Sequence, residues 1–309
     1  MITDVPLPHD FFTSGWRFLD YGWSQAVELL IDLRIQEDED QPNSSDVQEF
    51  WGLGRHNLIT SLALVQQGIE LLLKGCIAEV SPYLLIQPRP WPGKCDERDT
   101  PFSEFRTIDA QDLIKVYDTV RENRLSENFK RKVDYLRKHR NMAFHGINKS
   151  ITVEASQVLI AVFEAVENLN NRKKWLEIHK NFLENTPIAR FTSLDYPVKA
   201  RMMKEMEIIV KEFTPEEVER YTGFRVKEKP YECPWCKRVA GKYGGKPSFA
   251  QIVIDKDASA ESLYCFCCCE NLETIKANCQ VSDCDSTFLD QDGVCLICDY
   301  KNELEDEMI

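Results

Sequence analysis

Ten of the twelve cysteines in this 309-residue chain lie after residue 230, and most of them stand in close pairs. These pairs form two sets of four, Cys233, Cys236, Cys265 and Cys268 in the first and Cys279, Cys284, Cys295 and Cys298 in the second. Thiolates paired at such spacings are typical of sites that hold one zinc ion between two short loops. The sequence therefore predicts two zinc ions, one in each of two small modules, residues 231–272 and 273–301.

Both metals are expected to be structural, because a site closed by four thiolates has no open coordination position for a substrate. Modules this short bury too little apolar surface to fold alone, so metal binding would supply their stability. The segment PSFAQIVIDKD, residues 247–257, has the alternating pattern of a strand, which favours a β-rich zinc ribbon. Cys267 and Cys269 lie beside Cys265 and Cys268, so the ligands within 265–269 stay open.

Helical periodicity dominates the chain before the cysteines. It predicts helices over residues 16–34, 47–80, 109–123, 127–145 and 152–184, with a proline-rich irregular loop at 81–108. Residues 1–185 are therefore expected to form an all-α bundle. A helical connector, 186–230, follows, with a helix near 198–213 and a shorter one marked by Thr214, Pro215, Glu217 and Gly223. Residues 302–309 form an acidic tail.

The net charge of −13 argues against a protein built for nonspecific nucleic-acid binding, but the charge is uneven. Residues 1–60 carry a balance of −8, whereas residues 121–149 carry +6, with nine basic and three acidic side chains. No run approaches the ~20 apolar residues of a membrane span, and the N-terminus lacks the features of a signal peptide. Clustered thiols also suit a reducing compartment. We expect a cytoplasmic protein with no membrane association.

The basic segment contains RKHRNMAFHG, residues 137–146, which places an arginine in an apolar helix face. At about 100° per residue, Arg140 falls in the middle of the stripe formed by Phe129, Val133 and Leu136, with Ala143 and Phe144 beyond. A buried guanidinium is costly unless a carboxylate or a ligand satisfies it. Arg140 is therefore expected to have a partner.

Two further side chains near Arg140 suit the cleavage of RNA without a metal. Asn141 and His145 are one helical turn apart and share a face. A histidine can accept or donate a proton at neutral pH, and an arginine can hold two phosphate oxygens. The same residues are also compatible with a solvated basic face or a structural ion pair.

The string from Arg140 to His145 resembles the arginine–x4-6–histidine motif of HEPN domains, the "higher eukaryotes and prokaryotes nucleotide-binding" all-α domains. The resemblance covers roughly residues 10–185 and includes a preceding long helix with an acidic residue, a variable loop and a helix after the motif. It implies a metal-independent endoribonuclease of a defence or toxin system, acting as a homodimer with a shared cleft on an RNA substrate. A protein or ligand trigger would release its activity.

Carried over by position, the resemblance makes His145 the general acid or base, Arg140 the phosphate contact and Asn141 an orienting group. Glu70, in the earlier helix, is the candidate acidic residue and would pair with Arg140. Glu70 is also four residues before Lys74, so a surface pair between these two is the alternative.

Two other functions stay open from the sequence. The first is a catalytically silent interaction protein, and the second is a zinc-ribbon regulator that binds nucleic acid. The first cysteine module offers basic and aromatic residues for the second function: Lys237, Arg238, Lys242 and Lys246, with Tyr231, Trp235 and Tyr243. The alternative is that the aromatic rings only pack a minimal core.

Overall fold

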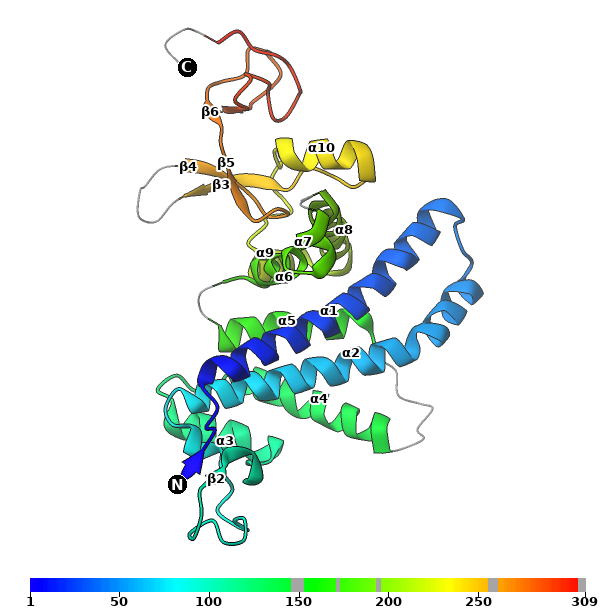
Figure 1. Ribbon diagram of the computed structural model, residues 1–309. Coiled ribbons are helices and arrows are strands. Elements are labelled where there is room, and N and C mark those ends of the chain that lie inside the picture. Colours follow the sequence, from blue (N-terminus) through cyan, green and yellow to red (C-terminus); the bar gives the residue numbers. More distant parts are fainter. Residues whose placement is uncertain (146–152, 171–172, 193–195, 255–260, 305–309) are drawn as a thin grey trace. The chain divides into compact units, whose positions relative to one another are not determined.

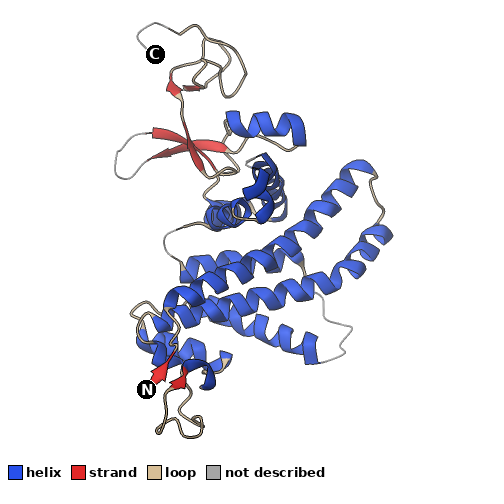
Figure 2. Cartoon of the chain, viewed as in Figure 1, coloured by secondary structure: helices blue, strands red, loops and turns tan. Residues whose placement is uncertain are grey.

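The computed structural model describes residues 1–145, 153–170, 173–192, 196–254 and 261–304, and the chain is mainly helical (Figures 1 and 2). It divides into two compact units, Met1–Lys173 and Lys174–Ile309. The first unit is mainly helical, and it ends before the boundary at 185 that the periodicity predicts for a helical bundle. The two cysteine modules belong to the second unit.

The described residues of unit 1 form five α-helices and a pair of very short parallel strands. The helices are α1 (Pro8–Glu39), α2 (Ser44–Ala78), α3 (Ala110–Val120), α4 (Glu127–His145) and α5 (Ala155–Leu169), and the strands are β1 (Ile2–Thr3) and β2 (Thr100–Pro101). Helix α2 packs against each of the other four helices, so it forms the centre of the unit (Figure 1). The predicted loop 81–108 is mostly irregular, but it includes β2 and two 3₁₀ turns, Pro82–Leu85 and Phe102–Glu104.

Small residues allow α1 and α2 to approach closely along their length. On α2 they recur every seven residues, at Gly54, Ser61, Gly68 and Gly75. A Cβ atom on Gly68 would lie 2.8 Å from Leu19 of α1, and one on Gly75 would lie 2.8 Å from Phe12. A seven-residue repeat keeps one seam facing the partner helix in a pair of packed helices. This seam explains how two helices of 32 and 35 residues stay in contact.

Replacing Gly22 by alanine is expected to destabilise unit 1 by about 1–3 kcal/mol through overpacking. The added Cβ would lie 2.6 Å from Cγ2 of Val65 and 2.8 Å from the carbonyl oxygen of Ser61. Gly52 is the matched control, because its Cβ would meet nothing within 4 Å, and its replacement by alanine should stabilise the helix by about 0.5–1 kcal/mol. Urea unfolding followed by circular dichroism measures the free energy of unfolding of both variants. Equal changes for the two substitutions would contradict the close approach of α1 and α2 along this seam.

Helix α4 begins where the sequence predicts, and one face of it is buried. The backbone N–H of Phe129 donates to Oγ of Ser126 at 3.2 Å, which caps the first turn. Phe129, Val133 and Leu136 are buried against the bundle, as expected. The side chains of Ala143, Phe144 and His145, and all of Gly146, lie outside the described residues.

One helix in the described part of the chain, α2, is long and apolar enough to cross a membrane by length and composition. Most of its apolar stretch is buried inside the unit. A core helix of a helical bundle has the same length and composition, and so α2 carries no information about location.

Unit 2 begins with a layer of short helices. These are α6 (Trp175–Glu184), α7 (Pro187–Thr192), α8 (Tyr196–Glu212) and α9 (Pro215–Thr222). The prediction for α9 is confirmed in detail, since Thr214 and Glu217 form a reciprocal capping box and Gly223 ends the helix with a φ of +93°. A polar cluster is buried in this layer, where Glu205 accepts a hydrogen bond from Nε of Arg201 at 2.5 Å and lies 3.1 Å from Nε2 of His179.

The single helix predicted over 152–184 is wrong. The structure has two helices there, and the division between the compact units falls between them. Asn170 caps α5 in an extended conformation, and asparagine has low helix propensity because its side chain competes for backbone hydrogen bonds. Trp175, at the start of α6 in unit 2, is fully buried. We infer that the packing of this side chain fixes the position of the break between α5 and α6.

The cysteine modules contain the remaining strands and one helix that the sequence analysis did not predict. Strands β3 (Ala250–Ile254), β4 (Glu261–Cys265) and β5 (Glu270–Leu272) form an antiparallel sheet, and β6 (Ile275–Lys276) pairs with β7 (Phe288–Leu289). The expected strand within 247–257 is therefore present as β3. Helix α10 (Pro234–Tyr243) starts at the first cysteine pair, with Pro234 at its first position.

Candidate functional site

Arg140 projects from α4 towards two polar side chains on the central helix α2. Its Nε donates to Oε1 of Gln66 at 2.9 Å, and its Nη2 lies 3.7 Å from Oε1 of Glu70. Gln66 and Glu70 are buried, whereas about a third of the Arg140 side chain (32%) remains exposed. The arginine therefore has the carboxylate partner that the sequence predicts, while part of its side chain stays accessible to solvent.

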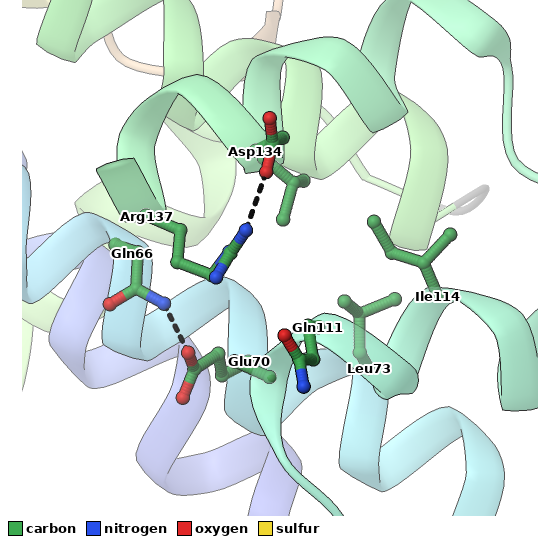
Figure 3. A pocket seen from close by; sticks show the side chains of 9 residues that line it. Gln66, Glu70, Leu73, Gln111, Ile114, Asp134 and Arg137 are labelled. Atoms are coloured by element: carbon green, nitrogen blue, oxygen red, sulfur yellow. Dashed lines mark hydrogen bonds and ion pairs between the residues drawn. The ribbon is translucent and has the colours of Figure 1, made fainter. Parts of the chain in front are cut away.

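Gln66 connects the two charged groups. Its amide nitrogen donates to Oε1 of Glu70 (Figure 3). Its amide oxygen accepts from Nε of Arg140. Lys74 donates instead to Oγ1 of Thr107 at 3.3 Å. Glu70 thus contacts the arginine rather than forming the surface pair with Lys74. Because a glutamine can donate and accept at once, it holds the carboxylate and the guanidinium in a defined order.

A small pocket opens beside this network, between α2, α3 and α4 (Figure 3). Gln66, Glu70, Gln111, Asp134 and Arg137 line its polar part, and its volume is about 70 Å³. That volume admits a few water molecules or one small group, far less than the ~300 Å³ of a small-molecule site. A polymer would therefore contact the surface at this point rather than enter it.

The basic segment is more nearly neutral in the folded protein than its sequence indicates. Among the described residues of this segment, five cations have acidic partners: Arg121 pairs with Glu79, Lys130 with Asp118 and Glu127, Arg137 and Lys138 with Asp134, and Arg140 with Glu70. Hydrogen bonds from Lys138 and Arg137 lower the pKa of Asp134, so this carboxylate stays charged at neutral pH. The positive field over α4 is correspondingly reduced.

The other predicted site residues lie at the same end of α4. Asn141 follows Arg140 and is partly exposed. His145 is the last described residue of the helix, and its side chain lies outside the description. The structure thus brings Glu70 and Arg140 together and places Asn141 next to them in the chain.

Gln66 is a site residue that the sequence analysis did not select. The sequence contains a signal that could have identified it. Gln66 and Glu70, four residues apart, lie in the apolar stripe of α2, next to Val65 and Ile69. Two polar residues in such a stripe require a buried partner, and a long basic side chain can supply it.

The first set of four cysteines is assembled as a candidate metal centre. The sulfurs of Cys233 and Cys268 lie 3.8 Å apart, as do those of Cys236 and Cys265, and all four lie within 4.8 Å of one another. A disulfide would require about 2.05 Å, whereas tetrahedral Zn–S bonds of about 2.3 Å place sulfurs about 3.8 Å apart. Burial raises the pKa of the Cys265 thiol well above its ordinary value, so a bound cation is needed to stabilise the thiolates.

The second set of four cysteines has the same geometry in a more exposed setting. Cys279 and Cys298 lie 3.6 Å apart, and so do Cys284 and Cys295. The backbone N–H of Ile297 points at the sulfur of Cys295 at 3.4 Å, an arrangement that supports a thiolate from the outer shell of a metal site. Both sets can therefore each hold one metal ion.

Among the four neighbouring cysteines at 265–269, the fold selects Cys265 and Cys268. Cys265 ends β4, and the turn that follows returns Cys268 beneath it, with the N–H of Cys268 3.5 Å from the sulfur of Cys265. Cys267 is buried outside the set of four, and Cys269 occupies the left-handed turn position with a φ of +53°. The ligands that the sequence left open are decided by this turn.

The aromatic rings of the first module differ in their exposure to solvent. Tyr231 is buried and packs edge-on against Phe288, 5.8 Å between ring centres. Trp235, at the second position of α10, is 52% exposed, and Tyr243 at the end of the helix is 39% exposed. Core packing thus accounts for Tyr231 but not for Trp235.

Comparison with protein-family models, with curated protein sequences and with solved structures gives no match to this chain.

Proposed function

We propose that this chain is a metal-independent endoribonuclease, with Arg140 and His145 on α4 as its reactive residues. The observation that supports this best is the arrangement around Arg140. Buried Gln66 and Glu70 hold the guanidinium on one side, while about a third of the arginine side chain stays exposed. An arginine held in this way is oriented before an anionic substrate arrives, which lowers the entropic cost of binding.

In the proposed reaction the 2′-hydroxyl of RNA loses a proton and attacks the adjacent phosphorus atom, and the 5′-oxygen leaves with a proton. His145 serves as the general acid or base, since its ordinary pKa is near neutrality. Arg140 contacts the phosphate oxygens, whose charge increases in the transition state, and Asn141 orients the imidazole. The products carry a 2′,3′-cyclic phosphate and a 5′-hydroxyl.

One histidine per chain is enough if two copies meet, because the second proton transfer then falls to the other copy. We therefore propose a homodimer in which α4 of each copy lines one cleft. The cysteine modules would hold zinc as a structural ion, and the protein would act in the cytoplasm as part of a defence or toxin system. The acidic first sixty residues would limit indiscriminate RNA binding until a protein or ligand trigger acts.

One observation favours the rival function, a catalytically silent interaction module. The contacts of Arg140 with Gln66 and Glu70 would also serve to lock α4 onto α2. An arginine with only a structural role would not need to expose part of its side chain to solvent. About a third of the Arg140 side chain is exposed, and for this reason we prefer the ribonuclease.

Cleavage of RNA by the purified wild-type chain in excess EDTA tests the proposal. Fragments with cyclic phosphate and 5′-hydroxyl ends are expected, because attack by the 2′-hydroxyl requires no metal. The zinc content is measured before and after incubation, so that loss of the structural metal is not mistaken for a requirement in catalysis. Absence of cleavage, or fragments with 5′-phosphate ends, would rule against the proposed mechanism.

A further inference from the structure

Helix α10 presents an outward stripe that neither the metal centre nor the proposed reaction uses. At about 100° per residue, Trp235, Arg238 and Lys242 fall within about 60° of one another. All three are exposed, whereas Cys236 and Val239, which lie about 130° and 70° around the helix from the middle of this stripe, are buried. The helix thus separates the side chains that support the cysteine module from those that face solvent.

Two cations flank the exposed indole of Trp235. The guanidinium carbon of Arg238 lies 4.9 Å from the ring centre, and Nζ of Lys199, from α8, lies 5.2 Å from it. Helices α8 and α10 pack against each other within unit 2, which holds Lys199 at this position (Figure 1). Lys242 in turn lies over the ring of Tyr243, 5.1 Å from its centre.

These cations are not neutralised as those of α4 are. Residues 233–254 contain four basic and no acidic side chains, in a chain of net charge −13. Lys237, on another side of α10, pairs with Glu232 and Asp299. Across the described ranges, no ion pair holds Lys199, Arg238 or Lys242. This stripe therefore keeps its positive charge.

We propose that the stripe of Trp235, Arg238 and Lys242, with Lys199 beside it, is a binding site for single-stranded nucleic acid. An exposed indole stacks with any base, for about 1–3 kcal/mol per base. An exposed cation–π contact is weaker than such a stack, so a base displaces a flexible cation from the ring. The displaced cation then contacts a neighbouring phosphate. Paired bases inside a duplex cannot offer their faces in this way, so the site favours single strands.

Fluorescence anisotropy with the full-length protein tests this site. The probes are a labelled 2′-O-methyl oligouridine and an oligodeoxythymidine, each of about 16 nucleotides, the upper end of the span of a small binding fold. Neither probe has the 2′-hydroxyl nucleophile, so binding is measured whether or not the chain cleaves RNA. Failure of the proposed ribonuclease would therefore leave this result unaffected, and the reverse also holds.

Trp235→Ala is expected to weaken binding of the single strands about 5- to 150-fold, the affinity equivalent of one lost stack. Trp235→Phe should retain most of the affinity. Arg238→Ala and Lys242→Ala should each lower the slope of log K against log salt by about 0.7, the value for one phosphate contact on a single strand. Phe191→Ala is the matched control, because Phe191 in α7 of the same unit is 90% exposed.

Three results would overturn the site. The first is that the wild-type chain binds neither probe, and the second is that Trp235→Ala binds the probes as tightly as the wild type. The third is equal affinity for a duplex of the same length, because a duplex can use the cations but not the indole. Zinc content is measured for every variant, and a Trp235→Ala protein with full zinc content shows that the module has folded.

Discussion

Replacing Cys265 by serine is expected to remove one zinc ion per chain and to unfold residues 231–272. The wild-type chain should carry two zinc ions and this variant one. The first module has a small core around a three-stranded sheet and α10, and structural zinc contributes an apparent binding free energy of about 10–16 kcal/mol at neutral pH. No core of this size offsets that loss. Elemental analysis of the purified proteins gives the zinc content directly.

Cys267→Ser is the matched control for this experiment. Cys267 is as buried as Cys265 and lies two residues away, but it is not part of the set of four. Its variant should keep both ions. Trypsin provides a second measure, because unfolding of α10 exposes Lys237, Arg238 and Lys242 to cleavage, while unit 1 keeps its own core and its helical signal. Loss of zinc from Cys267→Ser with retention in Cys265→Ser would reverse the assignment of ligands.

The second large effect is expected in RNA cleavage, and it rests on the proposed function. His145→Ala should reduce the rate of cleavage in EDTA by about 10²–10⁴-fold, the usual contribution of a general acid or base. Arg140→Ala should reduce it by about 10²–10³-fold, as the loss of one group that stabilises transition-state charge does. The cleavage rate of Arg140→Lys should lie between those of Arg140→Ala and the wild type, because an ammonium group keeps the charge but cannot make the bidentate contact.

Two residues of the same helix serve as controls. Arg131 is exposed, and Nδ1 of His139 donates within its own helix to the carbonyl oxygen of Tyr135 at 2.9 Å. Alanine at either position should leave cleavage within a few-fold of the wild type. Thermal unfolding is compared in parallel, because Arg140→Ala leaves Glu70 buried without its cation. Activity that persists equally in Arg140→Ala and His145→Ala would assign the cleavage to a contaminant or to another site.

Local signals in the sequence were sufficient for several elements. The capping box at Thr214 and Glu217 and the glycine stop at Gly223 are formed by residues within one segment, and the structure contains them as predicted. The pairing of cysteines into two sets follows in the same way, since the short spacing of a pair, two intervening residues or four between Cys279 and Cys284, already places both sulfurs on one loop. Helix α4 is also a local prediction, with Ser126 at its start.

Predictions failed where contacts between distant segments decide the structure. The break between α5 and α6 depends on the burial of Trp175 in unit 2, and the helical periodicity runs through that break. The formal charge of residues 121–149 also does not show that carboxylates outside this segment, Glu79 and Glu70, pair with Arg121 and Arg140. Spacing along a helix shows which side chains share a face, but not what faces them.

The sequence alone determined that this chain contains a helical region followed by two four-cysteine modules, because helix caps, apolar periodicity and cysteine pairs act over a few residues. Only the tertiary structure decided that Gln66 links Arg140 to Glu70, that Cys265 and Cys268 rather than Cys267 complete the first set of four, and that Tyr231 is buried while Trp235 faces solvent. Each of these depends on how segments far apart in the chain pack, and the free energy of that packing is shared among many residues that no single motif contains.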